Sequence, residues 1–173
     1  MSKIKLFNKF INEKDCEELH KWIVLNRRKA FFKKVDMEGE RWSTRFSSDL
    51  VFPDKAFEIR NKIIDAFNLK NFCEEEFFYK GMVASYASPG DTCYLHIDPV
   101  YVANTKTLHF NIKLSNNLGG NPILSDTEIP TGQGDMWSYF VSEIEHGSSL
   151  VYGHSPRTMW VFGFSVNENF TFK

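Results

Sequence analysis

Two stretches in the first half of the chain carry apolar residues three and four positions apart. This spacing is typical of a helix with one buried face. The first stretch follows Asn12, which can cap a helix, and its apolar positions are Cys16, Leu19, Trp22 and Ile23. The second follows Pro53, a residue suited to a first helical turn, and its apolar positions are Ala56, Ile59, Ile63, Ala66 and Phe67. We therefore expect two amphipathic helices that pack on a sheet.

From residue 76 onward the pattern changes to short runs of β-branched and aromatic residues, broken by Gly, Pro and Asn. The runs cover residues 77–86, 92–98, 107–114, 122–124, 135–140, 149–152 and 158–166. We expect about eight strands after the two helices, and an apolar strand-like start at 4–10. Helices do not alternate with these strands, which argues against a parallel α/β sheet. The pattern predicts a mainly β fold with N-terminal helices (α+β) and a jelly-roll core of two antiparallel sheets.

The length of 173 residues suits one domain with its own core, expected to span 1–173. Helical support would occupy about 1–75 and the jelly roll about 76–173. The polar stretch 33–52 is expected to form a long loop or an irregular hairpin, which often borders a binding site. It carries Arg41 and Arg45. Either arginine could meet a substrate carboxylate, although solvated charges on a surface loop explain both equally well.

Charge and cysteine content exclude several classes of protein. With 21 Lys and Arg against 22 Asp and Glu, the net charge of -1 gives no electrostatic reason to expect nucleic acid as a partner. No apolar run approaches the roughly 20 residues needed to cross a bilayer, so no membrane role is expected. Cys16, Cys73 and Cys93 lack CxxC spacing, and the N-terminus lacks a signal-peptide pattern. These features favour a soluble, cytoplasmic protein.

The first candidate for chemistry is His96-Ile97-Asp98, within an expected strand. Residues i and i+2 of a strand share a face, so an imidazole and a carboxylate would lie side by side. A further histidine would complete the two-histidine, one-carboxylate site of non-haem Fe(II) oxygenases. His146 and His154 compete for this role, and we favour His146 because a strand and a turn then separate it from Arg157. His20 lies off the helical stripe and is expected to be solvated.

The order of these motifs along the chain is more specific than any one of them. His96-x-Asp98 is followed by a Gly119-Gly120 turn, an aromatic strand after Gly134, then His146 and, eleven residues later, Arg157. In this order the sequence resembles the Fe(II)- and 2-oxoglutarate-dependent dioxygenases, whose core is a double-stranded β-helix. Within this superfamily the sequence most resembles the prolyl-hydroxylase branch. This narrower resemblance rests on residues 6–11, 82–86, 89–90, 94–98 and 119–120.

The resemblance implies a role for each motif residue. His96, Asp98 and His146 would bind Fe(II) as the catalytic centre, and Arg157 would hold the distal carboxylate of 2-oxoglutarate. Tyr86 would line the cosubstrate pocket. Dioxygen would be the third reactant, and a substrate C–H bond would be hydroxylated. Because related halogenases lack the carboxylate, Asp98 favours hydroxylation over halogenation.

Strand alternation adds further pocket candidates. It places Thr107, His109, Asn111 and Lys113 on one face of a strand, and we expect this face to contact the cosubstrate. Lys113 stands where some relatives carry a tyrosine that binds 2-oxoglutarate, so it could bind by charge or point to solvent. His109 could equally be a buried structural histidine. Substrate contacts are expected from Arg45, Tyr94 and Trp137.

Three alternatives compete with a hydroxylase of small-molecule or peptidyl, prolyl-like substrates. A nucleic-acid demethylase of the AlkB kind would carry a second arginine soon after the first, but Thr158-Met159-Trp160 follows Arg157. A non-enzymatic jelly-roll binding module would not require the order His, Asp, His, Arg. A cupin-type metalloenzyme without 2-oxoglutarate would not need Arg157 to face the metal.

Overall fold

The computed structural model describes residues 4–28, 32–34, 41–44, 51–69, 81–100 and 102–171. Within them lie two helices, α1 (Glu13–Asn26) and α2 (Asp54–Phe67). The strands of the same residues are β1 (Ile4–Phe7), β2 (Phe32–Lys34), β3 (Arg41–Thr44), β4 (Met82–Ala87), β5 (Cys93–His96), β6 (Thr105–Lys113), β7 (Leu118–Gly119), β8 (Pro122–Leu124), β9 (Thr127–Glu128), β10 (Met136–Phe140), β11 (His146–Ser148), β12 (Val151–Tyr152) and β13 (Arg157–Asn167).

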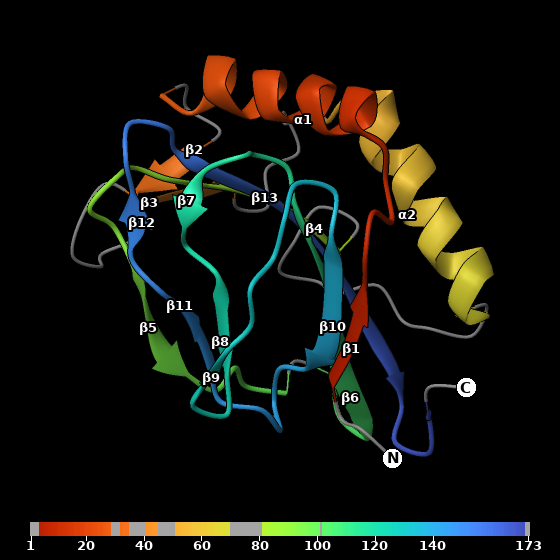
Figure 1. Cartoon of the computed structure of the whole chain (residues 1–173). Coiled ribbons are helices and arrows are strands. Elements are labelled where there is room, and N and C mark those ends of the chain that lie inside the picture. Colours follow the sequence, from red (N-terminus) through yellow and green to blue (C-terminus); the bar gives the residue numbers. More distant parts are fainter. Residues whose placement is uncertain are drawn as a thin grey trace.

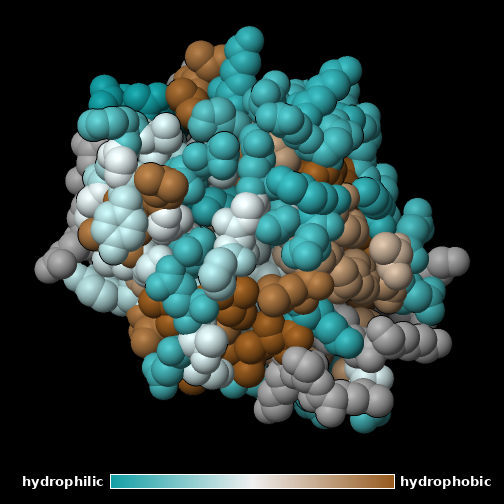
Figure 2. Space-filling view, viewed as in Figure 1, coloured by the Kyte–Doolittle hydropathy of each residue, from teal (hydrophilic) through white to brown (hydrophobic). Residues whose placement is uncertain are grey.

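Helix α1 begins where the capping residue predicts. Asn12 Oδ1 accepts a hydrogen bond from the backbone N–H of Asp15, 2.9 Å away, so one otherwise unpaired donor of the first turn is satisfied. The buried residues are Cys16, Leu19 and Ile23, as the spacing predicts. The opposite side carries charge, and the surface over α1 is mostly hydrophilic (Figure 2).

Helix α2 follows Pro53, which is the N-cap residue rather than part of the first turn. It ends at Asn68, whose left-handed conformation (φ 52°) lets its N–H return to the last carbonyls of the helix. Ala56, Ile59 and Ile63 are buried and Phe67 packs at the edge of the core. The inclusion of Ala66 in the buried stripe is wrong, because this residue is exposed.

The strands form two main antiparallel sheets. The major sheet has seven strands in the order β1-β10-β6-β13-β4-β3-β2, and the minor sheet has four in the order β5-β11-β8-β9. Strands β12 and β7 pair beside them. Both helices lie on one face of the major sheet, and the minor sheet lies on the other side (Figure 1). The predicted jelly-roll fold with N-terminal helices is confirmed.

Side chains along β6 point alternately to the two faces of the major sheet, and each face has its own apolar cluster. Leu108, Phe110 and Ile112 are fully buried against the helices. The opposite side of the major sheet, here called its inner face, carries His109, Asn111 and Lys113 and looks toward the minor sheet. A second apolar cluster lies on this side and comprises Leu124, Trp137, Tyr139, Val141, Ile144 and Met159.

The N-terminal part contributes strands as well as helices. β1 pairs with β10 at one edge of the major sheet, and β3 pairs with β4 near the other. β2 and β3 form an antiparallel pair, so the described part of 33–52 follows the hairpin alternative. The strand expected at 149–152 is wrong in its bounds, since pairing covers 146–148 and 151–152. Neither described helix is long and apolar enough to span a membrane.

Candidate metal centre and the buried cations behind it

The fold brings His96, Asp98 and His146 together. His96 ends β5, and His146 begins β11 directly opposite it. One ligand atom of each of the three residues lies within 4.8 Å of the others. Asp98 Oδ1 is 3.7 Å from Nε2 of His96, and its Oδ2 is 3.6 Å from Nε2 of His146. Two imidazoles and one carboxylate converging in this way could hold a metal ion.

Backbone carbonyls orient both imidazoles. Nδ1 of His96 lies 2.8 Å from the carbonyl oxygen of Tyr94, and Nδ1 of His146 lies 2.9 Å from that of Ile144. Because a carbonyl only accepts, each Nδ1 must carry the proton and donate it. The lone pair of a neutral ring is then on Nε2, the atom that faces Asp98. This is the arrangement that orients metal-binding histidines in proteins.

The centre faces the inner face of the major sheet. The ring of Tyr139, on β10, lies 5.0 Å from the ring of His146. Burial tends to raise the pKa of Asp98, but contact with His146 and the nearby histidines outweighs it, so the pKa falls below the usual range. Asp98 is therefore an anion at neutral pH. Burial lowers the pKa of His109 to about 4, so that ring is neutral beside the centre.

Strand β5 is irregular where it carries the centre. His146 pairs with His96, yet Ser148, two residues on, pairs with Cys93, three residues back. The extra residue is a β-bulge, a feature common beside active sites. It brings Cys93 and His96 to the same side and leaves Tyr94 and Leu95 exposed. The regular strand expected over 92–98 is wrong in this respect, and it is also too long: β5 ends at His96, so Asp98 follows the strand and does not share a strand face with His96.

Gly147 permits the close approach of the bulged strand. A Cβ atom at this position would lie 2.6 Å from the carbonyl oxygen of Cys93, which is closer than such atoms approach in proteins. The residue after His146 therefore has to be small for the side chains of His96 and His146 to meet.

Two buried cations lie on the inner face. Lys113, 2% exposed, donates from Nζ to the carbonyl oxygens of Gly119 (3.3 Å) and Thr131 (3.0 Å). Arg157, 3% exposed, donates from Nη1 to the carbonyl oxygen of Gly120, 2.9 Å away. Burial, followed by the charge of Arg157, lowers the pKa of Lys113 to about 8. Burial, followed by the charge of Arg41, lowers the pKa of Arg157 to about 10.

The turn between β6 and β8 supports these cations. Ser115 Oγ accepts from the backbone N–H of Thr158 (2.8 Å) and contacts Asn117, whose side-chain amide donates to the carbonyl of Gly119 (3.0 Å). Gly120 has φ 61°, and a Cβ there would lie 2.8 Å from Cδ of Arg157. The sequence predicts a turn here, but it does not show that the turn's carbonyls face the two cations.

Other predicted site residues divide between pocket and periphery. Asn111 is buried on the inner face, and its Nδ2 has no hydrogen-bond partner among the described residues. Trp137 pairs with Asn111 across the sheet and belongs to the second apolar cluster. Tyr94 is 47% exposed at the bulge. Arg45 lies outside the described residues.

Two residues, Tyr86 and His20, lie where the sequence did not predict them. A third, His154, lies apart from the candidate metal centre. Tyr86 belongs to the helix-side core, with the guanidinium of Arg27 5.2 Å above its ring, so it lies on the other face of the sheet from Arg157. His20 is not solvated, because it is half-buried with Nδ1 2.8 Å from Oγ1 of Thr158. His154 is exposed in the bend before β13, apart from the metal cluster.

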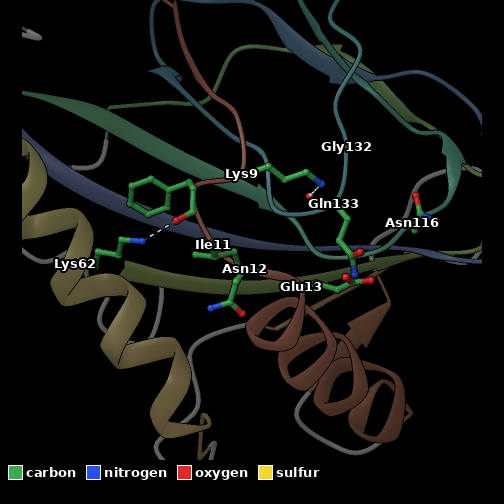
Figure 3. A pocket seen from close by; sticks show the side chains of 9 residues that line it. Lys9, Ile11, Asn12, Glu13, Lys62, Asn116, Gly132 and Gln133 are labelled. Atoms are coloured by element: carbon green, nitrogen blue, oxygen red, sulfur yellow. Dashed lines mark hydrogen bonds between the residues drawn. The ribbon is translucent and has the colours of Figure 1, made fainter.

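A separate hollow of about 690 Å³ lies at the start of α1 (Figure 3). Lys9 donates to the carbonyl of Gln133 (2.7 Å) and Lys62 to that of Phe10 (2.7 Å). None of its lining residues belongs to β5 or β11; they are Lys9, Phe10, Ile11, Asn12, Glu13, Lys62, Asn116, Gly132 and Gln133. These contacts tie the entry of α1 to the turn before β10, which is a structural role.

No protein-family model matches the sequence, and no curated protein sequence matches it significantly. The fold is nevertheless the double-stranded β-helix of Fe(II)- and 2-oxoglutarate-dependent oxygenases, as similar solved structures show. One is the collagen prolyl hydroxylase of Paramecium bursaria Chlorella virus-1 in complex with 2-oxoglutarate. Its TM-score is 0.68 at 13% identity, over 96% of this chain and 97% of that one.

Two further structures share the fold. A prolyl hydroxylase from Trichoplax adhaerens, in complex with a peptide fragment of hypoxia inducible factor, has a TM-score of 0.71 at 11% identity, over 96% of this chain and 84% of that one. HygX from Streptomyces hygroscopicus, with nickel, 2-oxoglutarate and hygromycin B bound, has a TM-score of 0.63 at 9% identity, over 98% of this chain and 85% of that one. At such identities the similarity establishes the fold, and function has to be argued from the site.

Proposed function

We propose that this protein is an Fe(II)- and 2-oxoglutarate-dependent oxygenase that hydroxylates a C–H bond of a small-molecule or peptidyl substrate. The observation that carries the proposal is the pairing of two sites. His96, Asp98 and His146 converge on one side, and the buried cations Lys113 and Arg157 lie on the inner face of the major sheet. The first site suits a metal ion, and the second suits the distal carboxylate of a dicarboxylate that also binds the metal.

The metal-facing residues fit ferrous iron. Two imidazole nitrogens and one carboxylate form the set that non-haem Fe(II) oxygenases use, and they leave positions open for other ligands. Both Nε2 atoms are presented by hydrogen bonds from Nδ1 to backbone carbonyls. With iron in place, 2-oxoglutarate and dioxygen supply the oxidising chemistry, which belongs to the cofactor.

The inner face fits 2-oxoglutarate. The planar guanidinium of Arg157 can give two parallel charge-assisted hydrogen bonds to the distal carboxylate, and the Lys113 ammonium adds positive charge. Gly120 leaves room beside Arg157 that a Cβ would fill. The unpaired Nδ2 of Asn111 is a further donor for a carboxylate or keto oxygen. We assign His109 to the same wall, as a neutral ring.

The protein itself would orient the metal ligands, supply their negative charge and keep water out of the site. Asp98 stays anionic, the two histidines keep one tautomer, and Trp137 and Tyr139 form an apolar wall that limits water. Tyr94 is 47% exposed at the bulge of β5, and we assign it to the edge of the site, where a substrate could contact it. Arg45 as a substrate contact, a single domain over 1–173 and a cytoplasmic location remain predictions from the sequence.

The buried cations also weigh against the alternatives. A metalloenzyme without 2-oxoglutarate, or a binding module without chemistry, would have no use for two neighbouring cations that are each at least 97% buried. Asp135 acts on Lys113 and Asp91 acts on Arg157, but burial still lowers both pKa values, so a further anion would stabilise the charged forms. A dicarboxylate cosubstrate gives both cations a partner. The peptide complex and the hygromycin B complex of the similar structures support both substrate classes, peptidyl and small-molecule.

The test is an anaerobic titration with Fe(II) and then 2-oxoglutarate, followed by oxygen and measurement of succinate. We expect one iron and one 2-oxoglutarate per chain, and slow succinate release without substrate. Arg157→Ala should keep iron and weaken 2-oxoglutarate about 100-fold, since a charge-assisted bidentate contact is lost. Arg27→Ala, the same change on the helix side, is the matched control. Failure of both ligands to bind, or unchanged affinity in Arg157→Ala, would overturn the proposal.

A further inference from the structure

Helix α1 is hydrogen-bonded to the strand that carries Arg157. Nδ1 of His20 lies 2.8 Å from Oγ1 of Thr158, although 138 positions of sequence separate the two residues. Thr158 follows Arg157 on β13 and is fully buried, with its side chain on the helix side of the major sheet. The ring of Trp22 packs 5.5 Å from that of Trp160, so α1 contacts the start of β13 at two points.

The backbone of Thr158 connects this contact to the turn between β6 and β8. Its N–H donates to Oγ of Ser115 (2.8 Å), and its carbonyl accepts from the N–H of Leu114 (2.9 Å). The hydroxyl proton of Ser115 goes to Oδ1 of Asn117, 2.8 Å away. The amide of Asn117 must then direct its Nδ2 to the carbonyl of Gly119, 3.0 Å away.

The network of hydrogen bonds ends at both buried cations. The carbonyl of Gly119 accepts from Nζ of Lys113 as well as from Asn117, and the next carbonyl, that of Gly120, accepts from Nη1 of Arg157. The side chains between α1 and the cations are buried, so water does not readily replace a lost partner. A change at α1 can therefore reach the groups that would hold the cosubstrate.

His20 occupies the outer end of this network. Burial lowers the pKa of His20 below its usual value, so the ring is neutral at pH 7. Because the Thr158 hydroxyl can donate or accept, either neutral tautomer forms the bond. Removing the imidazole would leave that hydroxyl buried without its partner, which is unfavourable. The start of β13 would have to shift to relieve this cost, and Arg157 is the adjacent residue.

We infer that His20 is a positioning residue for 2-oxoglutarate. Through Thr158 it fixes the start of β13 and the turn over residues 115–120, so that affinity for the cosubstrate depends on helix α1. The inference rests on the proposed function. His20 lies on the helix side of the sheet and contacts neither the cosubstrate nor the metal, so its loss should weaken 2-oxoglutarate and leave iron binding unchanged.

The test compares His20→Leu and His20→Asn with the wild type. Leucine fills similar space without a hydrogen bond, whereas the asparagine amide lies near the position of Nδ1 and can restore the bond. Anaerobic titration should show 2-oxoglutarate bound about 5- to 10-fold more weakly by His20→Leu, with Fe(II) affinity within twofold of the wild type. KM for 2-oxoglutarate in succinate release should rise by a similar factor, with kcat changed less. His20→Asn should recover most of the affinity.

A second variant tests the same bond from the other side. Thr158→Val removes the hydroxyl without changing the shape of the side chain, and it should weaken 2-oxoglutarate as much as His20→Leu does. The double variant should be no weaker than either single one, because both remove the same interaction. Asn26→Leu is the matched control: it removes the bond from Asn26 to the carbonyl of Trp22 within α1, and 2-oxoglutarate should bind as in the wild type.

Four outcomes would overturn the inference: unchanged affinity for 2-oxoglutarate in His20→Leu, an equal loss of Fe(II) affinity, no recovery in His20→Asn, or additive losses in the double variant. Should His20→Leu fail to fold by circular dichroism, Thr158→Val decides by the same criteria. If the wild type binds both ligands while one of these outcomes is seen, only the role of His20 fails. If the wild type binds neither, the proposed function itself fails.

Discussion

At the scale of single residues, the two histidines that compete in the sequence differ in what surrounds them. His146 is 7% exposed, its Nδ1 is bonded to a carbonyl, and its Nε2 faces Asp98. His154 is exposed in a bend. A metal ligand must have a defined orientation and a deprotonated nitrogen available to the ion, and the surroundings of His146 provide both.

His146→Ala should therefore lose tight iron binding, while His154→Ala should keep it. The expected loss is at least 100-fold in affinity, because one of three ligands is removed. The measurement is metal content after dialysis against a weak chelator, with circular dichroism to verify folding of both variants. Iron retained by His146→Ala and lost by His154→Ala would reverse the ligand assignment.

The lowered pKa of Lys113 predicts that binding of 2-oxoglutarate depends on pH. Burial holds its pKa at about 8, so the side chain is a cation below that pH and neutral above it. Affinity for 2-oxoglutarate should be constant from about pH 6.5 to 7.5 and fall as the pH rises through about 8 and 9. Arg157, with a pKa of about 10, stays charged over this range.

The measurement is anaerobic calorimetric titration of the metal-loaded protein at several pH values. Lys113→Met should bind 2-oxoglutarate more weakly at pH 7 and lose the fall above pH 8, because no ammonium remains to titrate. A variant whose profile still falls in parallel with the wild type would exclude Lys113 as the titrating group.

At the scale of elements, the bulge in β5 and the glycine opposite it decide whether the centre forms. The bulge shifts the register by one residue between Cys93 and His96, so that the buried thiol of Cys93 and the imidazole of His96 share one side. Gly147 allows this strand to approach β11. The centre thus depends on a backbone irregularity as much as on its ligands.

Gly147→Ala should weaken iron binding about 10-fold or more while the protein stays folded. The added methyl group would meet the Cys93 carbonyl, so β5 must move and His96 with it. Gly132→Ala is the matched control, because its nearest contact would be a side-chain oxygen of Asp135 at 3.3 Å, which can yield. Equal iron affinity in both variants would contradict this account of the bulge.

At the scale of the whole molecule, the proposed metal centre lies between two sheets that come from distant parts of the chain. The minor sheet supplies His96 and His146, and the major sheet supplies Lys113 and Arg157. A ligand that bridges them should hold the sheets together, because binding to the native state alone stabilises that state.

Fe(II) and 2-oxoglutarate together should raise the melting temperature. At 100 times its Kd each ligand adds about 2.7 kcal/mol, so the two together add about 5.4 kcal/mol. The melting temperature of a chain of this size shifts by about 2–4 °C per kcal/mol, so we expect a rise of about 10–20 °C. Asp98→Ala should lose this rise. The measurement is differential scanning calorimetry under nitrogen, and an equal rise in Asp98→Ala would show that the ligands bind elsewhere.

Local patterns in the sequence determined the elements and part of the site. The cap at Asn12, the stripe of α1 and the alternation along β6 depend on neighbours a few residues away, so each could be predicted and was observed. The spacing of His96 and Asp98 indicated a metal half-site for the same reason.

Only the tertiary structure decided which distant residues meet and on which side. Tyr86 and Arg157 lie on opposite faces of one sheet, His20 is sheltered by Thr158, and Arg41 reaches Cys93 across 52 positions of sequence. Such placements follow from strand register, and a single bulge changes register without a clear local signal in the sequence. The physical reason is that side-chain spacing along a strand is local, whereas pairing between strands is set by the packing of the whole fold.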